Sequence, residues 1–203
     1  MNNLFSRSAA LAALVLAAGP THAANFTLSG RISVHNAVVH IDFSLANAGT
    51  NVAVWSDSWL SGLNFDPVSA LWVASAGDHI LVTQVDDDDT IGAGQGGYDT
   101  GFRFANLAPG QYRVSLAASF NTANGTRLSQ GFAYDNQTPI LLTEWNQPSY
   151  DPNANDQKGG FWRLNFSNVD GVSVVPEPTT WALMALGLAG LAGLSAHRRR
   201  AGH

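Results

Sequence analysis

Four consecutive aspartates, Asp86 to Asp89, are the densest group of ionisable side chains in the sequence. Adjacent carboxylates repel one another, so they either spread into solvent or are drawn together by a cation. Ca²⁺ prefers about six to eight oxygen ligands in a flexible loop, and this run directly follows a predicted strand. A solvated acidic turn without a metal is the alternative. The candidate calcium ligands are Asp66, Asp86, Asp87, Asp88, Asp89 and Asp99.

Aromatic side chains are plentiful, with six tryptophans and ten phenylalanines. Trp72 and Trp162 lie within predicted strands and are expected in the core. Other aromatic residues stand at strand ends or in loops beside Asn, Gln and Asp, where their faces could stack on sugar rings. The alternative is that they anchor loops against the body of the fold. The candidate carbohydrate contacts are Trp55, Trp59, Trp145 and Tyr150.

Catalytic patterns are few. The chain has no cysteine, which excludes disulfides and thiolate catalysis, and it has no H-E-x-x-H or G-x-S-x-G motif. His35 and His40 are an odd number of residues apart in an extended stretch, so they are expected on opposite faces. Glu144, beside Trp145, is the one feature that suggests a polysaccharide hydrolase. We expect a protein that is not an enzyme, with a secreted hydrolase as the alternative.

The segments that must position these residues read as short strands. Apolar and polar residues alternate with period two, as in Val39, Ile41 and Phe43 against His40 and Asp42, and no long helical period occurs. Clusters of Gly, Asn, Asp and Pro separate the strands, and Pro109-Gly110 predicts a type II turn. This pattern favours an all-β fold, an antiparallel, jelly-roll-like β-sandwich. The predicted strands are 26–34, 39–45, 52–55, 70–74, 79–85, 101–105, 112–118, 132–134, 139–143, 161–166 and 172–175.

The strand-rich part, residues 24–175, has the length of one domain. Six basic and fourteen acidic residues give it a formal charge of −8. A domain this acidic, without a basic stripe, repels nucleic acid.

The first 23 residues are typical of a signal peptide. Arg7 is followed by the apolar run 9–18, which is too short to span a bilayer. Gly19 and Pro20 end this run, and the small residues Thr21 and Ala23 suit cleavage after Ala23. The body is therefore expected outside the cytoplasm.

The last 28 residues, 176–203, read as a membrane-crossing tail. An apolar stretch, 179–196, is about 27 Å long as a helix, which nearly matches a hydrocarbon core of about 30 Å. Positive charge after the helix keeps that end in the cytoplasm and places the body beyond the inner membrane. The motif residues are Pro176, Glu177, Pro178, Arg198, Arg199 and Arg200.

This order of Pro-Glu-Pro, apolar helix and arginine cluster resembles the PEP-CTERM sorting signal. The resemblance implies that an exosortase-type membrane protease recognises Pro176, Glu177 and Pro178, that the arginines retain the tail, and that the protein passes to the cell envelope or the exopolysaccharide matrix of a biofilm. A permanently anchored single-span protein is the alternative.

A second resemblance covers residues 52–120. An Asp before an apolar strand (Asp66), an acidic cluster after a strand (86–89) and a Pro-Gly-x-Tyr hairpin (109–112) look like the bacterial pre-peptidase C-terminal domain. The pattern is also similar to exported sandwiches that carry the PEP-CTERM tail. The likeness to those exported proteins implies a β-sandwich without an assigned activity.

Overall fold

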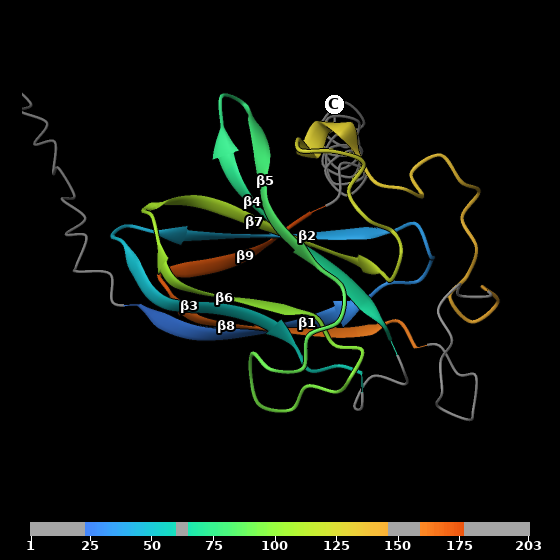
Figure 1. The fold of residues 1–203 in the computed structure, drawn as a ribbon. Helices are drawn as coiled ribbons and strands as arrows, with labels where there is room; N and C mark the ends of the chain where they lie inside the picture. The colour runs from blue at the N-terminus through green and yellow to red at the C-terminus, as the bar shows by residue number, and fades with distance from the viewer. Residues whose placement is uncertain (1–22, 60–64, 146–158, 177–203) are drawn as a thin grey trace, which may run out of the picture.

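The computed structural model describes residues 23–59, 65–145 and 159–176. Within these residues nine strands form two stacked antiparallel sheets, with one short 3₁₀ turn (Figure 1). The all-β, antiparallel prediction is confirmed. The elements are β1 Ala24–Arg31, β2 Val38–Leu45, β3 Gly49–Ser56, β4 Pro67–Ser75, β5 Asp78–Val85, β6 Gly101–Leu107, β7 Gly110–Ala118, η1 Leu128–Gln130, β8 Phe161–Val169 and β9 Gly171–Val175.

The strand order is β1-β8-β3-β6 in one sheet and β5-β4-β7-β2-β9 in the other. The first eight strands pair as nested partners: β1 with β8, β2 with β7, β3 with β6 and β4 with β5. The last strand, β9, is added to the free side of β2. The edge strands β1 and β9 therefore lie on the same side of the sandwich, and they make direct contacts.

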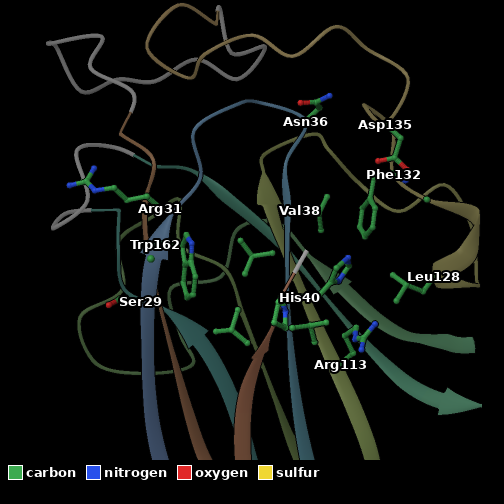
Figure 2. Close-up of a pocket in the computed structure, with 16 residues that line it drawn as sticks. Ser29, Arg31, Asn36, Val38, His40, Arg113, Leu128, Phe132, Asp135 and Trp162 are labelled. Carbon is green, nitrogen blue, oxygen red and sulfur yellow. Dashed lines mark hydrogen bonds between the residues drawn. The ribbon is translucent and has the colours of Figure 1, made fainter. Parts of the chain in front are cut away.

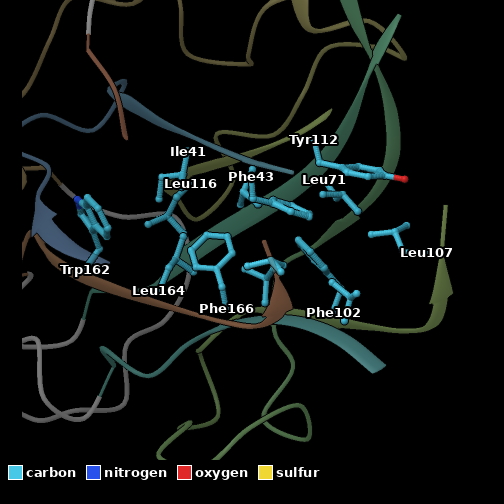
Figure 3. Close-up of a cluster of buried hydrophobic side chains, with 14 of the residues drawn as sticks. Ile41, Phe43, Leu71, Phe102, Leu107, Tyr112, Leu116, Trp162, Leu164 and Phe166 are labelled. Carbon is cyan, nitrogen blue, oxygen red and sulfur yellow. The ribbon is translucent and has the colours of Figure 1, made fainter. Parts of the chain in front are cut away.

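The core lies between the two sheets (Figure 3). In β2 the alternating residues Ile41, Phe43 and Leu45 are buried, as the sequence pattern predicts. Strand β8 contributes Leu164 and Phe166 from the opposite sheet, and the Phe43 and Phe166 rings lie 5.9 Å apart. Burial of these apolar side chains is the main force that holds the sheets together.

A second, smaller core lies on the outer face of the five-stranded sheet. The ring of Phe132 meets Trp72 edge-on at 6.2 Å, and Leu128 packs beside them. The strands predicted at 132–134 and 139–143 are wrong, because this segment makes turns and isolated bridges such as Val34 with Leu141. Its apolar residues cover the sheet instead of extending it.

The hairpin at Pro109-Gly110 also differs from the prediction. A type II turn needs a positive φ at the glycine, but Gly110 is not among the described residues with positive φ. It is already the first residue of β7 and pairs with Leu45. The Tyr112 hydroxyl donates to the Ala108 carbonyl at 2.8 Å and ties down the turn.

In the part of the chain that the structure describes, no helix is both long enough and apolar enough to cross a membrane. The predicted signal peptide and the predicted helix at 179–196 lie outside the described residues.

Candidate functional site

Three carboxylates from two segments meet at one end of the five-stranded sheet. Each of Asp66, Asp86 and Asp87 offers an oxygen atom within 4.8 Å of the others. Asp66 immediately precedes β4 and Asp86 immediately follows β5. Because β4 and β5 are antiparallel neighbours, with Ser69 opposite Val85, the start of one and the end of the other lie together.

The third neighbour is Ser119, at the end of β7, which pairs with β4 on its other side. The Ser119 hydroxyl lies 3.3 and 3.4 Å from the two oxygens of Asp86, and its backbone N–H donates to the Asp66 carbonyl at 2.8 Å. Asp66 and Ser119 are buried, whereas Asp87 is exposed. The group is therefore open to solvent on one side.

Electrostatics at this group disfavour negative charge. Burial, and secondarily the neighbouring Asp87, raise the pKa of Asp86 above its ordinary value. Burial also raises the pKa of Asp87. Carboxylate oxygens converging in this way are the donors that a hard divalent cation prefers, and a cation would offset the repulsion between them.

The other three predicted calcium ligands are not part of this group. Asp88 accepts hydrogen bonds from the backbone and the hydroxyl of Thr90, at 2.8 and 2.6 Å, and so shapes a local turn. Asp89 is exposed.

Asp99 is completely buried and acts as an acceptor that fixes two loops. Its carboxylate accepts hydrogen bonds from the Ser56 hydroxyl at 2.5 Å and from the backbone N–H groups of Ser58, Trp59 and Gly96 at 3.0, 3.2 and 2.8 Å. Its own carbonyl accepts a bond from the Asp88 N–H at 2.7 Å. Asp99 therefore ties the aspartate-rich loop to the end of β3, a role that the sequence analysis did not foresee.

Three of the four predicted carbohydrate contacts, Trp55, Trp59 and Trp145, lie within the described residues. Trp59 is 4% exposed and packs on Tyr98 at 4.5 Å, so it has no free face. The Trp55 indole N–H donates to the Ala93 carbonyl at 3.3 Å, and Trp145 packs on the buried His35 at 5.2 Å. These three residues anchor loops, while Tyr150 lies outside the described residues.

A groove of about 910 Å³ lies where the chain leaves the sandwich, and the sequence analysis missed it. Trp162 forms one wall, and His40, Phe132 and Leu128 form the other (Figure 2). Val175 and Pro176, at the end of β9, also line it. No local sequence signal marks this groove, since its walls come from strands that meet only through long-range pairing.

Comparison with known families identifies one feature. The model of the PEP-CTERM protein-sorting motif matches residues 174–200, which confirms the tail resemblance. The motif points to an exported protein that is processed by exosortase, a membrane protein, on its way to the cell envelope. No curated protein matches the chain. The resemblance to the pre-peptidase C-terminal domain stays a prediction.

The buried position of Asp99 yields a test of its structural role. Replacing Asp99 with Asn turns an acceptor oxygen into a donor beside several N–H groups, and should lower the free energy of unfolding by more than about 2 kcal/mol. Asp89→Asn, in the exposed part of the same loop, should change it by less than about 0.5 kcal/mol. Chemical denaturation of the two variants measures the difference, and equal values would contradict the assignment.

Proposed function

We propose that this chain is a non-enzymatic β-sandwich protein of the cell envelope or of the extracellular exopolysaccharide matrix, released there by exosortase. The observation that carries the proposal is the sorting motif at 174–200, which begins inside the last strand of the folded body. The same segment that completes the sheet thus leads directly into the signal for delivery.

The proposed route uses both ends of the chain. Residues 1–23 direct export as a signal peptide, and the apolar stretch 179–196 crosses the inner membrane with Arg198, Arg199 and Arg200 on the cytoplasmic side. Exosortase then recognises Pro176, Glu177 and Pro178 and cuts nearby. The body, residues 24–175, passes to the envelope or the biofilm matrix.

The body is proposed as a binding or structural module. The nested pairing of its first eight strands supports a jelly-roll topology, an architecture common in lectin-like domains. Its formal charge of −8 argues against a nucleic acid partner. Glu144 is exposed in a turn, with its N–H bonded to the Leu141 carbonyl, and this position gives the hydrolase alternative no support.

A stabilising Ca²⁺ at Asp66, Asp86 and Asp87 is part of this proposal. The support is the convergence of three carboxylates within 4.8 Å and the raised pKa values of two of them. A cation bound only by the native state would stabilise the fold and thereby replace the disulfides that this exported chain lacks.

Processing at both ends is the first expected outcome. Intact-mass spectrometry of the extracellular protein should show a species that begins after residue 23 and ends near 176–178. The chain has two glutamates, Glu144 and Glu177, so one substitution can be compared at both. Glu177→Gln should slow tail removal, whereas Glu144→Gln should be processed like the wild type. A secreted protein that retains its arginine cluster would refute the route.

The second expected outcome is that the thermal stability of the protein depends on calcium. Excess chelator should lower the thermal unfolding midpoint by several degrees at neutral pH, and Asp86→Asn should abolish that difference while Asp89→Asn preserves it. The metal-free form should behave differently with pH. The pKa values of Asp86 and Asp87 are raised in the folded state. The stability that their protonated forms give the metal-free protein is therefore complete below about pH 3.8, and it is lost as the pH rises through the raised pKa values. An unfolding midpoint that does not change with chelator would end the calcium proposal.

A further inference from the structure

The groove at the end of β9 is a built site rather than a gap between loops. The backbone of β1 lies directly against the indole of Trp162, and Gly30 makes this approach possible. A Cβ at Gly30 would come within 2.6 Å of the indole ring. The wall that Trp162 forms is therefore held in place by the strand beside it (Figure 2).

Trp162 carries an unsatisfied donor. The side chain is only 3% exposed, and its indole N–H has no hydrogen-bond partner among the described residues. Buried donors of this kind cost free energy and are rare in native proteins. A ligand in the groove would satisfy it if one of its oxygen atoms reached this N–H.

His40 forms part of the opposite wall. Its Nδ1 atom is also buried without a partner among the described residues. Burial, and secondarily Arg113, lower the pKa of His40 to about 4, so the ring is neutral at ordinary pH. A neutral imidazole offers one donor and one acceptor, which suits a hydroxyl group.

The two arginines that line the described part of the groove, Arg31 and Arg113, do not direct a free positive charge into it. The Arg113 guanidinium is held by both oxygens of Asp42, at 2.6 and 2.9 Å. Arg31 borders the groove, but its side chain points away from His40 and Phe132 (Figure 2). Asp135 adds a carboxylate at the rim, and the whole body is strongly acidic. Acidic ligands are therefore disfavoured.

The remaining walls are apolar. Val38, Leu128, Phe132 and Val175 face the groove, and its volume is at the upper end of that of small-molecule sites. Sugar rings combine hydroxyl groups, which donate and accept, with apolar C–H faces. We infer that this groove binds a segment of neutral polysaccharide, an inference that rests on the matrix role proposed above and deepens it.

The location of the groove links binding to processing. Pro176 lines it, and only two residues separate Pro176 from the apolar stretch that starts at 179. Three residue steps span at most about 11 Å, so a tail held in the membrane keeps the groove close to the bilayer surface.

The test uses the extracellular polysaccharide of the producing bacterium, separated by anion exchange into neutral and acidic fractions. Affinity electrophoresis of the processed protein measures retention in gels that contain either fraction. The neutral fraction should retard the wild type. Trp162→Phe, which removes the indole N–H, should weaken retention about fivefold. Trp59→Phe, an equally buried tryptophan outside the groove, should leave it unchanged.

A matched pair of blocking variants completes the test. Val38→Trp fills the groove and should weaken retention at least tenfold. Val82→Trp, on the exposed face of β5, should bind like the wild type, with thermal unfolding confirming that both variants fold. Retention by the acidic fraction alone, no retention, or equal effects of paired variants would overturn the inference. Mass spectrometry of the same samples reports tail removal separately, so a failure of the proposed route is distinguishable from a failure of the groove.

Discussion

The pairing of β9 with β2 is the interaction on which the rest of the molecule depends. Five residue pairs, from Ser44 opposite Gly171 to His40 opposite Val175, join the last strand to the sheet. The entry into β9 is fixed as well, because the Asp170 N–H donates to the Ser44 carbonyl at 3.0 Å and its carboxylate accepts the Ala46 N–H. The next residue after β9 is Pro176, within the sorting motif. The β-sandwich and the sorting motif are therefore joined without a linker. A protease that acts on the motif would work beside the groove.

The same principle of antiparallel pairing explains why chemically active residues gather where they do. The loop after β5 and the segment before β4 meet because the two strands are neighbours, and β7 adds Ser119 to the same end. At the same end of the five-stranded sheet, β2 begins and β9 ends near the start of β8, which brings His40 close to Trp162. Each group depends on strand order and not on a contiguous motif. A calcium ion beside β4 and β5 and a polysaccharide segment beside β2 and β9 would thus bind at the same end of one sheet, on different strands.

Much of the fold could be predicted from the sequence because alternation is a local property. It identified the inward face of β2 and the burial of Trp72 and Trp162, and strand ends placed Asp66 with Asp86 and Asp87 as candidate ligands. What depends on distant contacts was missed. Phe132 lies in a segment with strand-like composition. The segment nevertheless forms turns, and its Phe132 ring packs on Trp72 at the outer face of the sheet. Asp99 resembles a calcium ligand until the four hydrogen-bond donors around its carboxylate are known. Nothing in the local sequence distinguishes the Trp162 indole from an ordinary core side chain.

The central claim is that the folded body extends to the residue before Pro176. Amide hydrogen exchange of the full chain in detergent micelles, followed by peptide mass spectrometry, tests it most directly. We expect residues 171–175 to exchange far more slowly than an unstructured peptide, with protection that is lost together with that of β2 as denaturant is added. Exchange of 171–175 at the unstructured rate, while β2 stays protected, would show that β9 is not part of the sheet and would contradict the account.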